Sequence, residues 1–75
     1  MATSSRGRLA AEVRDRRVQL GLRQEELADL AGVSERFVYA LENDKRTVQL
    51  DKVIDVLSAV GLHLEIHRGA DREVR

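Results

Sequence analysis

The stretch QEELADLAGVSERFVYALE, residues 24–42, decides the fold because its helical pattern is interrupted once, at the tetrapeptide AGVS. On both sides of this break, apolar residues recur at helical spacing. Gly32 can adopt the left-handed conformation that ends a helix, and Ser34 is a favourable N-cap for the next one. Two short helices joined by a short turn containing glycine predict a helix-turn-helix, with helices over about 24–31 and 34–43.

Two further helices are expected to flank this motif. The first covers about residues 8–20 and stops at Gly21, and the last covers about residues 50–60 and stops at Gly61. The residues expected to face the core are Leu9, Val13, Leu20, Leu27, Ala28, Ala31, Val33, Val38, Leu41, Leu50, Val53, Ile54 and Leu57. The pattern therefore predicts one mainly α domain of four helices.

The apolar period changes after the last helix. The segment LHLEIH, residues 62–67, alternates apolar and polar side chains, which is a strand pattern of period two. A single strand is not stable alone, so we expect a short C-terminal β-strand that pairs with its copy across a dimer. The alternative is a strand that lies against the chain's own helices. The expected divisions are a flexible N-terminus (1–7), a helix-turn-helix domain (8–61), a dimerisation strand (62–68) and a flexible tail (69–75).

The composition is that of one small domain. The chain has 75 residues, no cysteine, and only Phe37 and Tyr39 as aromatic residues. A domain of this size buries only about 60% of the surface that its unfolded chain exposes, so dimerisation is a natural source of further buried surface. The lack of cysteine excludes disulfides and thiolate metal sites. No apolar run approaches the roughly 20 residues of a membrane span, and we expect a cytoplasmic protein.

The charges are segregated along the chain. The 13 basic and 13 acidic residues cancel, and this total alone argues against a nucleic-acid-binding surface. However, residues 6–23 carry six arginines against two acids, whereas residues 24–44 carry six acids against Arg36 alone. The net charge of zero therefore conceals a basic region and an acidic region.

The second helix of the motif presents a face that could read bases. At about 100° per residue, Arg36 and Ala40 point most directly away from the core. Arg36 could bond two acceptors of a guanine, Glu35 could accept from a cytosine amine, and Ala40 could contact a thymine methyl group. The expected base-reading residues are Ser34, Glu35, Arg36, Tyr39 and Ala40. The alternative interpretation is an ordinary solvated helix face.

The run LGLRQEELADLAGVSERFVYALENDKR, residues 20–46, resembles helix-turn-helix regulators of the phage Cro/C1 repressor type, the xenobiotic-response-element (XRE) group. With the helix at 50–57 included, the resemblance implies a lambda-repressor-like fold. It also implies a buried ion pair between Arg17 and Glu42. The residues that it implies as contacts to DNA phosphates are Arg23, Gln24, Asn43, Lys45, Arg46 and Thr47. For the two cations of this loop, the alternative is ordinary surface charge.

Two positions depart from the resembled family. Arg23 stands where the family has Thr or Ser to cap its second helix, and Asp44 stands where it often has Gly. Without this cap at Arg23, we expect the N-terminal end of the helix over about residues 24–31 to be less stable. At the second position, an acid next to the phosphate contacts is expected to weaken DNA binding.

The ending GLHLEIHR, residues 61–68, resembles that of the Hip-type antitoxins, small DNA-binding proteins that repress their own operon and bind a kinase-type toxin. The resemblance implies a homodimer with Leu62, Leu64 and Ile66 in its interface. Such a dimer places two recognition helices about 34 Å apart over a palindromic site. The expected partners are double-stranded operator DNA, a second copy of the chain and a kinase-type toxin.

Enzymatic activity is not expected. The chain has no cysteine nucleophile, no glycine-rich phosphate loop and no serine near a plausible base–acid pair. His63, Glu65 and His67 alternate on one face of the expected strand, but their spacing is not that of a metal motif, so we expect no metal and no cofactor. The predicted function is a sequence-specific repressor that serves as the antitoxin of a toxin–antitoxin operon. The alternatives are a solitary or restriction–modification controller, and a protein-interaction module with little DNA affinity.

Overall fold

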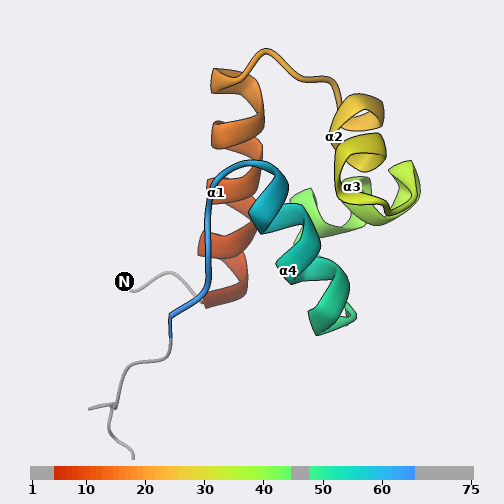
Figure 1. The fold of residues 1–75 in the computed structure, drawn as a ribbon. Helices are drawn as coiled ribbons and strands as arrows, with labels where there is room; N and C mark the ends of the chain where they lie inside the picture. Colours follow the sequence, from red (N-terminus) through yellow and green to blue (C-terminus); the bar gives the residue numbers. More distant parts are fainter. Residues whose placement is uncertain (1–4, 45–47, 66–75) are drawn as a thin grey trace, which may run out of the picture.

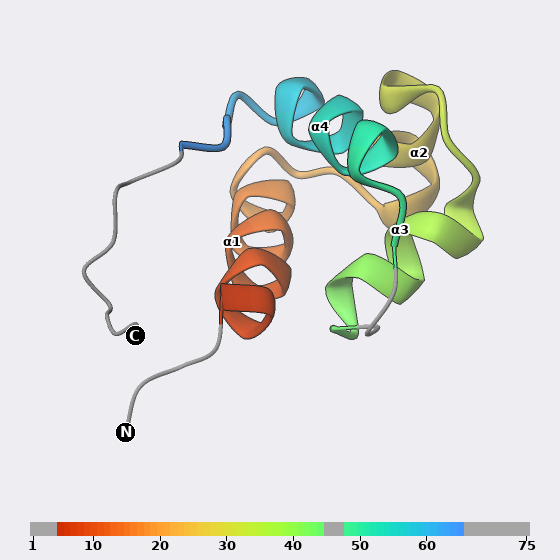
Figure 2. The same ribbon diagram turned by 90° about the horizontal axis from the view of Figure 1, so that it is seen from below.

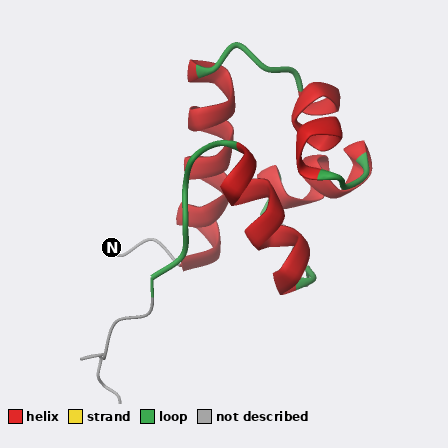
Figure 3. Cartoon of the chain, viewed as in Figure 1, coloured by secondary structure: helices red, strands yellow, loops and turns green. Residues whose placement is uncertain are grey.

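The part of the chain that the structure describes folds into four helices (Figure 1). The computed structural model describes residues 5–44 and 48–65. Its helices are α1 (Ser5–Gln19), α2 (Gln24–Ala31), α3 (Glu35–Glu42) and α4 (Leu50–Ala59), and loops make up the remainder of the described chain (Figure 3). The mainly α fold predicted from the sequence is confirmed. Within the described ranges, no helix has the length and apolar character needed to cross a lipid bilayer.

The break between α2 and α3 follows from two residues. Gly32 has φ 75° and ψ 30°, and its N–H donates to the Ala28 carbonyl at 2.9 Å, which ends α2. Two residues later, the Ser34 hydroxyl oxygen accepts from the Phe37 N–H at 3.0 Å and caps α3. As a result α3 turns away from the axis of α2 instead of continuing it (Figure 1).

The bounds of the central helices agree with the sequence pattern, whereas those of the outer helices shift. α2 has the predicted bounds, and α3 begins directly after its predicted cap. α1 begins at Ser5, before the expected start near Arg8. The added turn contains Gly7 but no proline, and glycine disfavours a helix by only about 1 kcal/mol relative to alanine. α4 ends at Ala59, and Val60 forms its C-cap.

The core consists of aliphatic side chains from all four helices. Its buried members are Val13, Leu27, Ala28, Val38, Leu41, Val53, Val56, Leu57 and Val60. α2 packs on both α3 and α4, and α3 also packs on α1 (Figure 2). In addition, the Arg16 Nε–H donates to the Val60 carbonyl at 2.8 Å and ties α1 to the end of α4.

Three expected core residues are exposed. Leu50 and Ile54 on α4 are 63% and 45% exposed, and Leu20 lies in the turn after α1 at 44%. On α4 the buried stripe begins one turn later than expected, so that Val56 and Val60 are buried instead. Both stripes contain Val53 and Leu57 and both have helical spacing, so periodicity alone does not separate them.

The segment after α4 forms no strand within the part of the chain that the structure describes. Residues 62–65 are loop, and the Leu62 N–H donates to the Leu57 carbonyl at 2.8 Å, which keeps Leu62 partly buried against the core. A strand requires a hydrogen-bonded neighbour, and the described residues of the single chain supply none. Ile66, His67 and the expected tail lie outside the described residues.

Candidate nucleic-acid interface

α3 divides into a buried face and an exposed face. Val38 and Leu41 are buried in the core, whereas Arg36 and Tyr39 are exposed. Ala40 is partly buried, so it lies at the edge of the exposed face. The other two expected base-reading residues, Ser34 and Glu35, are exposed at the N-terminal end of the helix. The structure thus places all five on one surface, and Ser34 additionally caps the helix.

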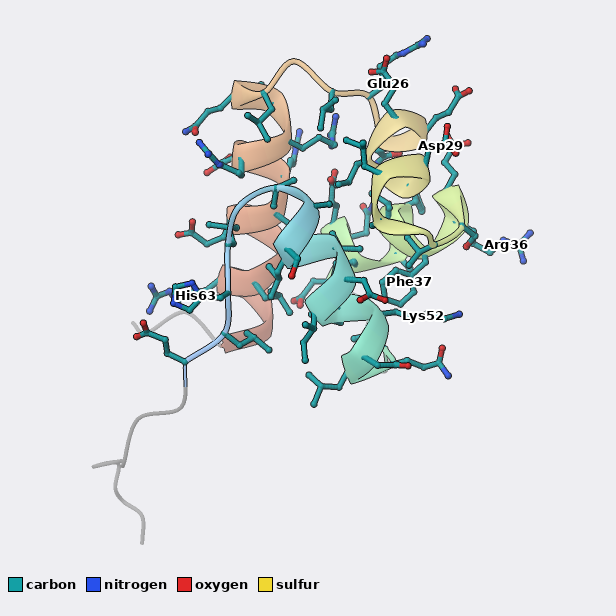
Figure 4. The ribbon with its side chains drawn as sticks, viewed as in Figure 1. Glu26, Asp29, Arg36, Phe37, Lys52 and His63 are labelled. Atoms are coloured by element: carbon teal, nitrogen blue, oxygen red, sulfur yellow. The ribbon has the colours of Figure 1, made fainter. Side chains whose placement is uncertain are left out.

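Arg36 extends into solvent from this surface (Figure 4). Among the described residues, its guanidinium group has no ion-pair or hydrogen-bond partner, and its N–H donors therefore face outward without a protein acceptor. A guanidinium group in this state can bond two acceptors at once, as the N7 and O6 atoms of a guanine require.

A polar network fixes the C-terminal end of α3 to α1. Arg17 Nε and Nη2 donate to Glu42 Oε2 and Oε1 at 2.7 and 2.9 Å, which is a two-bond pairing of guanidinium and carboxylate. The two side chains are 15% and 2% exposed, respectively. Arg17 Nη1 also donates to the Leu22 carbonyl at 2.8 Å. Hydrogen bonding to Glu42 raises the pKa of Arg17 above its usual value, so the pair keeps its cation at every pH at which proteins are normally folded.

Gln24 belongs to the same network. Its Nε2 amide donates to Glu42 Oε1 at 3.1 Å, so one of its two amide hydrogens points into the protein. The resemblance implied a phosphate contact from this side chain. In the structure, only the second amide hydrogen is available for such a contact.

The start of α2 is stabilised without the family's Thr or Ser. An arginine side chain carries only donors and cannot accept from the helix N–H groups. Instead, the backbone N–H of Arg23 donates to Glu26 Oε1 at 2.7 Å, which is one half of a capping box. The Arg23 side chain is therefore not used as a cap. Its Nε lies 3.7 Å from Glu26 Oε1 in an exposed ion pair, and the arginine side chain is 76% exposed.

The end of α3 also accommodates its departure from the family. Asp44 has φ 58°, in the left-handed region where glycine is most easily accepted and aspartate is tolerated. Next to it, the Asn43 side chain donates from Nδ2 to the Tyr39 carbonyl at 2.7 Å, so it is partly used in ending the helix. Lys45, Arg46 and Thr47 lie outside the described residues.

One cation beside these residues was not expected from the sequence. Arg14 on α1 lines a polar hollow of about 220 Å³ together with Arg17, Gln24, Glu42 and Asn43. It precedes Arg17 by three positions, so the two share a face of α1. This spacing is the signal that could have identified it.

The expected dimer residues border a second, more apolar hollow of about 380 Å³. It lies between α1, α4 and the C-terminal segment, and its apolar lining is Leu9, Leu57, Leu62 and Leu64. Leu64 is 47% exposed. On the same segment His63 Nε2 lies 3.1 Å from Glu65 Oε2, and both side chains are exposed. The described residues contain no group of three possible metal ligands.

These features define the class of protein. A glycine-broken pair of helices, with an exposed arginine on the second helix, is the arrangement of a helix-turn-helix regulator. The chain belongs to this family: residues 13–66 match the helix-turn-helix family model, the XRE group of transcriptional regulators.

A curated relative and two solved structures agree with this assignment. The chain is 42% identical over 64 residues to an uncharacterized HTH-type transcriptional regulator, y4mF, of Sinorhizobium fredii (strain NBRC 101917 / NGR234), covering 85% of this chain and 84% of the relative. It is also similar to a chain of an MDT protein and to a chain of a HipA-HipB-O2-O3 complex. In both cases the TM-score is 0.78 with 23% identity, covering 93% of this chain and 99% of the other. At this identity the likeness to the solved structures shows the fold.

Proposed function

We propose that the protein is a sequence-specific repressor that binds double-stranded DNA with α3 in the major groove. The observation that carries this proposal is the exposed Arg36 guanidinium, which has no described protein partner and lies on the helix that stands out from the turn. A major groove about 12 Å wide accepts such a helix. Around Arg36, the proposed base contacts come from Ser34, Glu35, Tyr39 and Ala40.

The proposed phosphate contacts surround this helix. Phosphate contacts orient a protein on the duplex without reading sequence. The exposed Arg23 side chain, the remaining amide hydrogen of Gln24, and Asn43 are available at the described end of the site. Lys45, Arg46 and Thr47, which follow α3 in the sequence and lie outside the described residues, complete the proposed set.

A titration of the protein with the DNA upstream of its own gene tests this proposal. We expect affinity to fall steeply as salt rises, since binding to phosphates releases counterions. We also expect a symmetric footprint and clear preference over a scrambled duplex of equal length. Equal, weak affinity for both duplexes would contradict the proposal. That result would favour an interaction module, for which the exposed acids Glu25, Asp29 and Glu35 on α2 and α3 are the supporting observation.

We further propose that the protein acts as a homodimer on a palindromic operator. The supporting observations are the hollow lined by Leu9, Leu57, Leu62 and Leu64, and the alternating pattern that continues to Ile66. In the proposed dimer, the C-terminal segments of two copies pair as strands, which supplies the neighbour that a single chain lacks. The two copies of α3 then lie about 34 Å apart.

Replacing Leu64 with aspartate is expected to convert the dimer to a monomer. Leu64 is exposed in the single chain, so the substitution leaves the helical core intact and places a charge in the proposed interface. Sedimentation equilibrium measures the change in mass. Val18→Asp is the matched control, because Val18 is 61% exposed on the outer face of α1. A Leu64→Asp protein that remains dimeric would overturn this interface.

The likeness to a chain of a HipA-HipB-O2-O3 complex, together with the GLHLEIHR ending, supports an antitoxin that binds a kinase-type toxin. A solitary or restriction–modification controller is the alternative. Expression of the neighbouring gene in a host, with and without this chain, distinguishes them. For an antitoxin we expect growth arrest that this chain relieves and a stable complex of the two purified proteins. A harmless neighbouring gene product favours the solitary regulator.

A further inference from the structure

A groove borders the exposed face of α3 on the side of α4. It has a volume of about 250 Å³, and its lining includes Ser34, Arg36, Phe37, Val48, Gln49 and Lys52. Phe37 and Val48 are partly buried against the core and give the groove an apolar side. Of the remaining lining residues four are polar, and two of these are cations. No acidic residue lines it.

Lys52 is held in this groove by an aromatic ring. Its ammonium nitrogen lies 5.9 Å from the centroid of the Phe37 ring, within the range of a cation–π interaction. Asp51 and Asp55 lie on the same helix, but within the described residues neither forms an ion pair with Lys52. The ammonium group is therefore positioned by Phe37 while its charge is not neutralised by a described carboxylate.

The groove lies on the side of the molecule from which Arg36 extends. Figure 4 shows Arg36 and Lys52 projecting from this side, with Phe37 between them. With Arg36 directed at base edges, the flank of the helix faces the sugar-phosphate backbone that borders the groove of the duplex. A lysine ammonium is a compact point charge that suits a phosphate better than a base edge.

We propose that this groove is a further DNA-contact site, in which Lys52 binds a backbone phosphate beside the bases read by α3. Ser34 and Gln49 supply neutral hydrogen-bond donors at its rim. Phe37 places the ammonium at the edge of α3, so that a residue of α4 contributes to orienting the recognition helix. This assignment rests on the proposed binding of α3 to duplex DNA.

The test compares Lys52→Gln with the wild-type protein on the duplex protected in the footprint and on a scrambled duplex. The plot of log K against log salt has a negative slope, and loss of one phosphate contact is expected to make this slope shallower by about 0.9. The ratio of the wild-type binding constant to that of the variant should therefore fall about 3.5-fold between about 50 and 200 mM salt. The substitution should reduce the affinity for both duplexes by the same factor, because a phosphate contact carries no sequence information. Lys52→Arg keeps the charge and should retain the wild-type slope.

Arg72→Gln serves as the matched control, because it removes the same charge from the segment 69–75, which contributes no proposed DNA or dimer contact. If the slope of log K against log salt changes equally in this control, the effect is one of net charge, and the proposed Lys52 site is wrong. An unchanged slope in Lys52→Gln would overturn it as well. If Arg36→Ala still lowers discrimination between the two duplexes in that case, the proposed function stands without the Lys52 site. Absence of salt-dependent, duplex-selective binding by the wild-type protein would overturn both. Circular dichroism of each variant confirms that the helices are retained.

Discussion

Replacing Arg17 with methionine is expected to lower the free energy of unfolding by about 3–5 kcal/mol. The substitution removes the cation that pairs with Glu42, whose side chain is 2% exposed. The carboxylate then keeps only the hydrogen bond from Gln24, and water cannot replace the lost cation at such a buried position. Urea denaturation followed by circular dichroism measures the change.

The double variant Arg17→Met/Glu42→Leu separates the buried charge from loss of packing. Replacing both partners with apolar side chains of similar size removes the unpaired charge, and stability is expected to return close to the wild-type value. A double variant that is as unstable as the single one would contradict this explanation. It would indicate that the hydrogen bond from Arg17 Nη1 to the Leu22 carbonyl, which both variants lack, contributes more to stability than charge compensation does.

Replacing Arg36 with alanine is expected to weaken binding to the cognate duplex by about 1–3 kcal/mol. The loss of binding free energy on scrambled DNA is expected to be much smaller. The reason is that Arg36 is exposed, has no described protein partner and can make two hydrogen bonds to one guanine. Competition titrations with cognate and scrambled duplexes measure the ratio of the two affinities. Folding should be unaffected because the side chain packs against nothing in the core.

Arg36→Lys distinguishes base reading from general attraction to DNA. Lysine keeps the positive charge but lacks the planar fork that bonds two acceptors. We therefore expect affinity for scrambled DNA to be retained while discrimination falls. Unchanged discrimination in Arg36→Ala would exclude Arg36 as the main base reader.

The sequence predicts best those parts of the fold that depend on local chemistry. Gly32 and Ser34 each act within a few residues, one by its backbone conformation and the other by its hydroxyl, and the helices that they separate have the expected bounds. The prediction is less successful on α4. There, Leu50 and Val56 belong to two apolar stripes with the same spacing. Only the packing of α2 against α4 selects the stripe that becomes buried.

The same distinction applies to the candidate site. The exposure of Arg36 and Tyr39 follows from the helical period once α3 is located. The contribution of Lys52 does not, because its approach to Phe37 depends on how α4 crosses α3. The inward turn of Gln24 likewise depends on the placement of Glu42, 18 positions later in the chain. Contacts between distant segments are set by tertiary packing, which periodicity does not encode.

The position of the single tyrosine has a practical consequence. The chain contains no tryptophan, and Tyr39 is 58% exposed on the outer surface of α3. Because the ring is already largely solvated in the native chain, we expect its intrinsic fluorescence to change little on unfolding. A nucleobase stacking on this ring would instead quench the emission. If α3 binds DNA as proposed, we therefore expect the emission of Tyr39 to fall as the duplex is added.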